Sequence, residues 1–329
     1  MTPLTCRAGQ YTEWLGKHPA WGAFPFFSIQ RSGKPRNKIS PRVKGIVCIL
    51  FAAFGFSMMS VFIRLAGDVP TAEKAFFRNI VALAVVGVLL AVKRVPLKPE
   101  KGSWPFITGR AVFGTIGLLL NFYAVDHLVL ADANMLNKLS PFFAIIFSVL
   151  LLREKPTAVQ IGGVLTALLG SVLIIKPGFE GAPFVPSLAG FISGAAAGLA
   201  YTFVRKLGAR GENSLRIVFY FSLFSTLLTL PFFLVSPVQL TGYQVLMLLL
   251  CGCSACVGQF GITQAYLLAP AKEISVYDYS QILFAAGLGY LFFRQIPDGW
   301  SMVGYMLICG AGVGMFLYNK RRDAEHDSK

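Results

Sequence analysis

The chain carries no formally charged side chain between Ile217 and Ala271. The hydrocarbon core of a bilayer is about 30 Å thick, and an α-helix needs about 20 apolar residues to cross it. The uncharged stretch is too long for a single crossing, and Pro237 together with Thr241 and Gly242 indicates a turn inside it. It is therefore predicted to hold two membrane-spanning helices.

The composition extends this conclusion to the rest of the chain. Of the 329 residues, 55% are apolar and 14% are charged, whereas soluble domains contain roughly 25% charged residues. We therefore predict an all-α integral membrane protein with ten transmembrane helices. The predicted spans are residues 45–65, 75–92, 104–124, 129–152, 157–176, 187–206, 215–236, 244–267, 271–293 and 299–319.

The formal net charge of +15 permits two interpretations. It could indicate binding to nucleic acid, but in a multi-pass membrane protein it first reports topology, because cytoplasmic connections collect Lys and Arg. With the N-terminus in the cytoplasm, the opposite-side connections hold only Arg64, Lys74, Lys176 and Arg294. Both termini are therefore predicted to be cytoplasmic, with no nucleic-acid partner. The basic residues then on the cytoplasmic side are Lys93, Arg94, Lys98, Lys101, Arg153, Lys155, Arg205, Lys206, Arg210, Arg216, Lys272, Lys320, Arg321 and Arg322.

The chain contains an internal repeat. Pro156 and Pro297 are 297 − 156 = 141 residues apart, and the same offset pairs Arg153 with Arg294 while keeping the loop breaks in step. Each half holds five spans, an odd number, so the two repeats are expected to be inverted. The predicted organisation is a poorly ordered cytoplasmic tail at 1–44, a first repeat at 45–176, a second repeat at 187–319, and a cytoplasmic C-terminal tail at 320–329.

Some spans reach their length only by including a charged side chain, and Lys138 is placed deepest among these. It lies about ten residues into its span, close to the membrane midplane at about 1.5 Å per residue. Asn134, Asn137, Lys138 and Pro141 follow i, i+3, i+4, i+7 spacing. One continuous helix would therefore carry all four on one side.

The repeat offset places Asn137 at the position of Asp278 in the ninth span. We hypothesise that Lys138 and Asp278 approach each other and lower the cost of each other's charge inside the membrane. Intramembrane ionisable residues usually mark solute or proton pathways. The alternative is a structural ion pair that only holds two helices together. The cavity predicted by the first hypothesis is lined by Lys138, Asp278, Asn134, Asn137, Tyr277 and Gln281.

Two arginines within predicted spans, Arg78 and Arg110, lie nearer to span ends. Their long side chains either extend to the lipid headgroups or bind an anionic group of a solute, and the sequence leaves both readings open. Other polar side chains at membrane depth either contact solute or bond to neighbouring helices. These further candidates for substrate binding or coupling are Asn121, Tyr123, Gln264 and Tyr266.

No metal site or cofactor is predicted. Cys251, Cys253 and Cys256 are close in sequence, but Cys251 and Cys253 point apart on one helix and no His or carboxylate accompanies them. The chain lacks the phosphate-binding, zinc-protease and serine-hydrolase motifs, and no soluble segment is large enough for an ATPase domain. We therefore expect neither enzymatic activity nor direct coupling to ATP hydrolysis.

The sequence ADAN at 131–134, followed by SPFF at 140–143 and REKP at 153–156, resembles the EamA-like family of the drug/metabolite transporter superfamily. The likeness covers residues 43 to 319, but Gln295 stands where the family often has Glu, and Asp278 belongs to no motif of the family. The resemblance implies a carrier in the plasma (inner) membrane that exports or exchanges small metabolites by alternating access. An ion gradient or the solute gradient would drive it.

The leading hypothesis is therefore a secondary transporter of a small metabolite, amino-acid-like or another small organic solute. Its expected partners are the solute and membrane lipid, and the protein is a monomer or a homodimer. The main alternative is an integral-membrane enzyme acting on a lipid or lipid-linked substrate, which would need acid, base or metal residues clustered at one membrane interface. The charged residues here are scattered and partly central, which favours the transporter.

Overall fold

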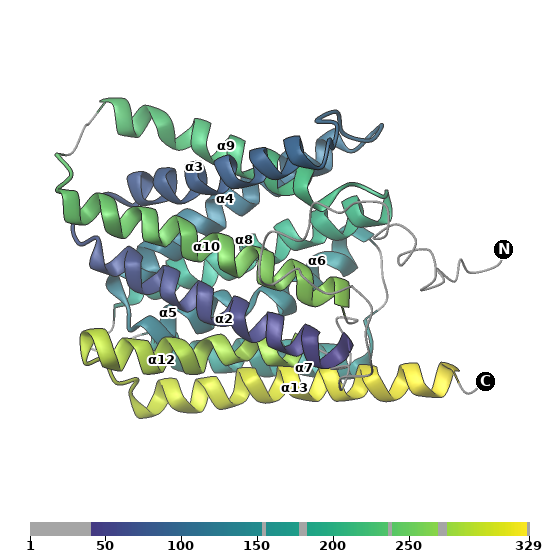
Figure 1. Cartoon of the computed structure of the whole chain (residues 1–329). Coiled ribbons are helices and arrows are strands. Elements are labelled where there is room, and N and C mark those ends of the chain that lie inside the picture. Colours follow the sequence, from purple (N-terminus) through teal and green to yellow (C-terminus); the bar gives the residue numbers. More distant parts are fainter. Residues whose placement is uncertain (1–40, 153–155, 178–182, 236–238, 269–274, 328–329) are drawn as a thin grey trace, which may run out of the picture. The chain divides into compact units, whose positions relative to one another are not determined.

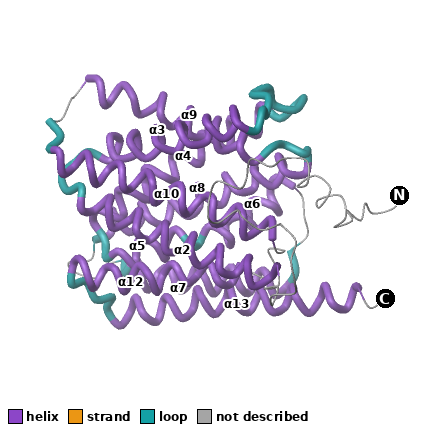
Figure 2. Tube along the Cα trace, in the orientation of Figure 1, coloured by secondary structure: helices purple, strands orange, loops and turns teal. Residues whose placement is uncertain are grey.

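The computed structural model describes residues 41–152, 156–177, 183–235, 239–268 and 275–327. The tail predicted at 1–44 therefore lies outside the described residues except for its last four, which already belong to a helix beginning at Pro41. The described residues contain helices and no β-strand, and most helices run lengthwise beside one another (Figure 1; Figure 2). The elements are α2 Pro41–Leu65, α3 Thr71–Val92, α4 Trp104–His127, α5 Leu130–Asn137, α6 Ser140–Leu152, α7 Ala158–Ile175, α8 Phe184–Ala209, α9 Ser214–Val235, α10 Gly242–Leu268, the 3-10 helix η2 Ser275–Tyr279, α12 Ser280–Phe293 and α13 Gly299–Asp327.

Nine segments of the described residues are long and apolar enough to cross a membrane, and they correspond to nine of the ten predicted spans. The exception is the predicted span 271–293. Its residues 271–274 lie outside the described part, and the remainder consists of η2 and the 14-residue helix α12. At 1.5 Å per residue α12 extends about 21 Å, less than the thickness of the hydrocarbon core. The described α-helix of this crossing therefore begins only at Ser280, where it follows the 3-10 segment η2 without a gap.

The fourth span also departs from one continuous α-helix. The sequence predicts one continuous helix over 129–152, but α5 ends at Asn137 and α6 begins at Ser140. The cause is Pro141, which has no N–H to donate to the Asn137 carbonyl and whose ring collides with that carbonyl in an α-helix. The prediction of one continuous helix over 129–152 is therefore wrong, because a turn at Lys138 and Leu139 separates α5 from α6.

The packing of the helices follows the internal repeat. The offset matches α2 with α8 and α4 with α10. The two most extensive helix contacts are those of α2 with α10 and of α4 with α8. When each helix is replaced by its match in the other repeat, the first contact becomes the second and the second becomes the first. The offset also matches α3 with α9 and α7 with α13, and the two helices of each of these pairs contact each other. This pattern is what two inverted five-helix repeats produce.

Helix α8 packs closely against the interrupted fourth span. A Cβ atom added at Gly194 would lie 2.5 Å from the Leu136 carbonyl oxygen, and one at Gly198 would lie 2.7 Å from the Ser140 carbonyl oxygen. These two glycines therefore lie against both sides of the break between α5 and α6, and their lack of a side chain allows the close helix contact. Leu136 and Leu139 are fully buried there, so the break is a fixed part of the core.

Candidate solute-binding site

Lys138 and Asp278 form an ion pair where the two spans that depart from one continuous α-helix meet. Lys138 is the C-cap residue that directly follows α5, and Asp278 lies in η2. The Lys138 Nζ donates to the Asp278 Oδ2 at 2.5 Å, and the two side chains are 11% and 17% exposed. The structure thus brings together the two ionisable side chains that the sequence placed on equivalent spans.

The Asp278 carboxylate keeps unused hydrogen-bonding capacity. Its Oδ1 is buried and accepts no hydrogen bond from the described residues. An ammonium group has three donor hydrogens and a carboxylate about four acceptor positions, so one contact leaves most of them available. Buried polar atoms are normally satisfied. The pair can therefore form further hydrogen bonds with polar groups of a solute, and the free carboxylate oxygen can accept a proton.

A second polar contact joins the same two spans. Gln281 on α12 donates its Nε2 to the Asn134 Oδ1 at 2.6 Å, and both side chains are buried. The Asn134 Oδ1 also accepts from Ser60 of α2 at 3.4 Å, and the Asn134 Nδ2 donates to the Leu130 carbonyl at 2.7 Å. Asn134 is therefore oriented by three neighbours. Together with the ion pair it forms the central polar layer, here defined as Asn134, Lys138, Asp278 and Gln281.

The two other predicted members of this cavity face elsewhere. Asn137 donates its Nδ2 to the Ser193 Oγ of α8 at 3.3 Å. Tyr277 packs beside Ile49 and Ala265 in a small apolar cluster. Neither contacts the described members of the central polar layer through a hydrogen bond.

The secondary polar candidates are dispersed over the molecule. Asn121 is buried in α4, and its Oδ1 finds no hydrogen-bond partner among the described residues. Tyr123 lies near the end of α4, where its ring is 4.3 Å from that of His127. Gln264 and Tyr266 belong to α10, but their side chains lie outside the described part of the structure.

Arg78 and Arg110 are found beside one aromatic ring. The Arg78 Cζ lies 5.5 Å and the Arg110 Cζ 4.2 Å from the centroid of Phe221 on α9. Arg78 is only 7% exposed. Of the two readings left open by the sequence, extension of Arg78 to the headgroups does not fit this burial.

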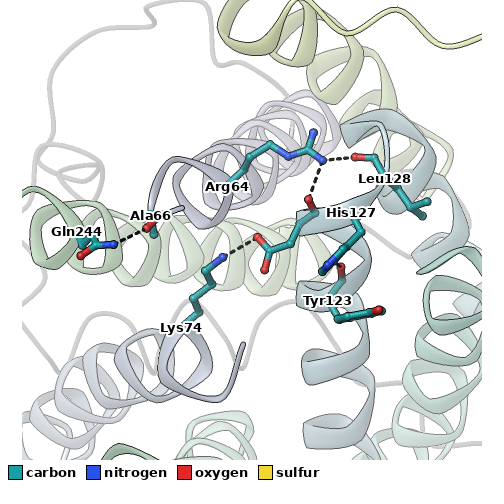
Figure 3. Close-up of polar contacts among 8 residues, drawn as sticks. Arg64, Ala66, Lys74, Tyr123, His127, Leu128 and Gln244 are labelled. Carbon is teal, nitrogen blue, oxygen red and sulfur yellow. Dashed lines mark hydrogen bonds and ion pairs between the residues drawn. The ribbon is translucent and has the colours of Figure 1, made fainter. Parts of the chain in front are cut away.

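One ionic cluster was missed in the sequence, where Arg64 and Lys74 were counted only as basic residues of the connections. Arg64 lies in the last turn of α2, Lys74 in the first turn of α3 and Asp126 in the last turn of α4. The Lys74 Nζ contacts the Asp126 Oδ1 at 2.7 Å, and the Lys74 side chain is 1% exposed. Figure 3 shows Arg64 pointing to the carbonyl oxygen of Leu128 and Lys74 pointing to the carboxylate of Asp126. Charges near span ends are the signal that could have revealed this cluster.

A second missed contact pairs Asp132 with Tyr305. The Tyr305 Oη donates to the Asp132 Oδ1 at 2.5 Å, and both residues are 8% exposed. Asp132 lies in the first turn of α5, where a carboxylate also interacts favourably with the helix dipole. This contact joins the first repeat to α13 and so links the two halves.

Asp298 has a different role at the start of α13. It accepts a hydrogen bond from the backbone N–H of Ser301 at 2.9 Å, as a helix N-cap does, and pairs with Lys176. Burial raises the pKa of the Asp298 carboxyl, but the hydrogen bonds from Lys176 and Ser301 outweigh this effect and hold the pKa below its usual range.

This lowered pKa leads to a pH prediction. The charged carboxylate stabilises the fold above the unfolded-state pKa, and this contribution is lost as the pH falls below about 4 through the folded-state pKa. Asp298→Asn keeps an N-cap residue but cannot titrate. We expect wild-type thermal stability to fall more steeply than that of D298N below about pH 4, by no more than about 1 kcal/mol because the Asp298 side chain is 54% exposed. Identical pH profiles of the two proteins would contradict the prediction.

No group of three or more metal-ligand side chains occurs in the part of the chain that the structure describes. The five cysteines described there are free thiols, and Cys251 is buried. The site is therefore described entirely by ion pairs, amides and hydroxyls.

A model of the EamA-like transporter family matches this chain twice, at residues 43–176 and 186–317. The two matches are the two repeats. A similar fold occurs in a solved crystal structure, with a TM-score of 0.58 and 19% identity over 85% of this chain and 99% of that one. At that identity the likeness concerns the fold alone.

Several curated proteins are similar over most of their length. The pseudopaline exporter CntI of Pseudomonas aeruginosa is 32% identical over 275 residues, covering 82% of this chain and 95% of the relative. Solute carrier family 35 member G1 of Homo sapiens is 27% identical, covering 82% of this chain and 78% of the relative. The riboflavin transporter of Vibrio cholerae is 26% identical, covering 81% and 90% respectively.

Proposed function

Because the chain belongs to the EamA-like transporter family and is a multi-pass membrane transporter of small metabolites, we propose that it is a secondary transporter working by alternating access. In this mechanism the two inverted repeats rock about a site at mid-membrane. The observation that supports it is the Lys138–Asp278 ion pair, formed where spans of both repeats depart from one continuous α-helix, with the Asp278 Oδ1 left unpaired.

The central polar layer would bind the solute in this proposal. Interrupted helices at mid-membrane expose backbone groups and polar side chains where a carrier needs them. A bound solute would exchange contacts with Lys138 and Asp278, and loss of those contacts would let the pair close again. The mixture of ammonium, carboxylate and amide groups suits an amino-acid-like or other small polar organic solute. Export is the direction that one relative's name favours.

The proposal extends to the setting of the protein. The carrier is proposed to lie in the plasma (inner) membrane with both termini in the cytoplasm, as a monomer or homodimer surrounded by lipid. No catalytic activity and no nucleic-acid partner are part of it. The basic connections of the sequence support this orientation.

Transport is tested with the purified full-length chain in liposomes. A panel of labelled amino acids and small organic acids is supplied outside, under a solute, proton or sodium gradient. We expect saturable uptake of at least one class, absent from protein-free liposomes and from liposomes holding heat-denatured protein. If none of these solutes crosses under any gradient, a carrier of this class is the wrong assignment.

A further inference from the structure

The two membrane-embedded arginines form an arrangement that the central polar layer does not explain. Arg78 of α3 and Arg110 of α4 come from neighbouring helices and stack beside Phe221. A cation near an aromatic face is attracted by the ring quadrupole, which leaves the positive charge itself uncompensated. Two like charges held close together in a medium of low dielectric constant repel each other.

Neither arginine has an anionic partner among the described residues. The ion pairs found there all involve other cations. Arg78 donates from Nη1 to the neutral amide oxygen of Asn79 at 2.7 Å, and the Nε atoms of Arg78 and Arg110 are both buried without an acceptor. An unpaired charge inside the membrane is costly and is usually retained for function.

A small cavity adjoins Arg78 between α3, α9 and α10. Its walls include Arg78, Phe221, Ser222 and Gln259, with aliphatic side chains such as Ala82 and Val86. Ser222 is fully buried, and its hydroxyl has no hydrogen-bond partner among the described residues. The cavity therefore combines a cation and an unused hydroxyl donor with an apolar wall.

The backbone beside Arg110 makes room for its guanidinium. A Cβ atom at Gly114 would lie 1.9 Å from the Arg110 Nη1 and 3.0 Å from the Phe221 Cε2. Any larger residue at this position would push the Arg110 side chain away from the ring. The absence of a side chain at position 114 thus keeps the second positive charge next to the first.

We propose that Arg78 and Arg110 form a binding site for the carboxylate of a small organic acid, separate from the central polar layer. A carboxylate accepts hydrogen bonds from guanidinium groups in a fork geometry and would neutralise the two charges. The Ser222 hydroxyl would donate a further hydrogen bond, and the apolar wall would contact the carbon chain. The free space is about the size of one water molecule and is lined by Arg78 and not by Arg110, so side chains would have to rearrange for one carboxylate to reach both arginines.

This inference rests on the proposed function, because the carboxylate would belong to the transported solute. It adds the chemical class: the solute carries at least one carboxylate. An amino-acid-like solute meets this requirement, whereas a neutral or purely cationic solute does not.

The test measures succinate binding by thermal unfolding of the full-length protein in detergent. Succinate is compared with succinamide, which is uncharged, and with inorganic phosphate and additional sodium chloride at equal ionic strength. We expect succinate to raise the unfolding midpoint more than the other three. Arg78→Gln and Arg110→Gln are each expected to weaken succinate binding at least about tenfold. An equal shift with chloride or phosphate, or an undiminished shift in both variants, overturns the proposal.

Three further variants separate binding from folding. Lys98→Gln removes one positive charge from an exposed position and is expected to bind succinate as the wild type does. Gly114→Ala keeps both charges but displaces Arg110, so it is expected to weaken binding. Arg78→Lys keeps the charge without the fork and should retain part of the affinity. Without ligand, R78Q is expected to unfold at or above the wild-type temperature, and a lower midpoint that R78K restores would indicate a structural arginine instead.

The two proposals fail in different ways. If solutes cross the liposome membrane but succinate binds neither the wild type nor any variant, the carboxylate site is wrong and transport stands. If succinate binds through Arg78 and Arg110 but no solute crosses, the carboxylate site stands and the transport proposal is wrong.

Discussion

Replacing Lys138 by methionine is expected to reduce solute transport by at least about 100-fold. The change removes the partner of Asp278, whose carboxylate is 17% exposed and would remain in a region of low dielectric constant. Removing one partner of a buried ion pair typically costs about 3–5 kcal/mol of stability, and if the same interaction energy is lost from the transport step, each 1.4 kcal/mol slows transport about tenfold. The rate is measured in proteoliposomes at equal amounts of inserted protein.

The double variant Lys138→Met with Asp278→Asn separates a transport role from a structural one. It removes both charges together, so the thermal stability lost in K138M is expected to return. If the pair binds solute or a coupling ion, transport stays absent although the protein is stable. Recovery of wild-type transport kinetics in the double variant would show that the pair only holds η2 against α5.

Lys176→Met provides the matched control. Lys176 is also paired with an aspartate, Asp298, but the latter is 54% exposed and the pair lies at the end of the bundle. Exposed ion pairs contribute about 0–1 kcal/mol. We therefore expect K176M to transport at close to the wild-type rate, in contrast to K138M.

Substitution of Gly198 by alanine is expected to destabilise the protein by about 1–3 kcal/mol or more. The new Cβ would lie 2.6 Å from the Phe143 Cβ and 2.7 Å from the Ser140 carbonyl oxygen, and backbone atoms cannot move aside as a flexible side chain can. Gly194→Ala meets the Leu136 carbonyl oxygen at 2.5 Å and should behave similarly. The unfolding temperature in detergent and the transport rate report the effect.

Gly162→Ala in α7 is the control for these two variants. An added Cβ there meets no atom within 4 Å, and alanine is the better helix former by about 1 kcal/mol. We expect G162A to be as stable as the wild type or slightly more so. If G198A and G194A unfolded at the same temperature as G162A, the close contact of α8 with the break would not be a determinant of stability.

The membrane character could be predicted from the composition of each segment, and the repeat from the constant offset between matching residues. A helix in lipid must be apolar along its length, so the uncharged stretch from Ile217 to Ala271 can hold only spans and a turn. The basic connections indicate orientation for a similar reason, since charges avoid the hydrocarbon core. The family likeness follows from short patterns around Pro141 and Pro156.

The candidate site could be predicted only in part. Lys138 and Asp278 were identified because a charge at mid-span is rare and the repeat offset placed them on equivalent helices. Asn137 and Tyr277 were expected beside them, but Asn137 donates a hydrogen bond to Ser193, and Tyr277 packs against apolar neighbours. The prediction from i, i+3, i+4 spacing assumes a continuous helix, and this assumption fails where α5 ends before Lys138.

Sequence alone thus determined that the chain spans the membrane as two repeats, because burial in lipid restricts composition residue by residue. The tertiary structure decided which side chains meet. The contacts of Arg78 and Arg110 with Phe221, of Lys74 with Asp126 and of Tyr305 with Asp132 each join different helices. Such contacts depend on how each helix is rotated and shifted against its neighbours, and that is set by the packing of the whole bundle.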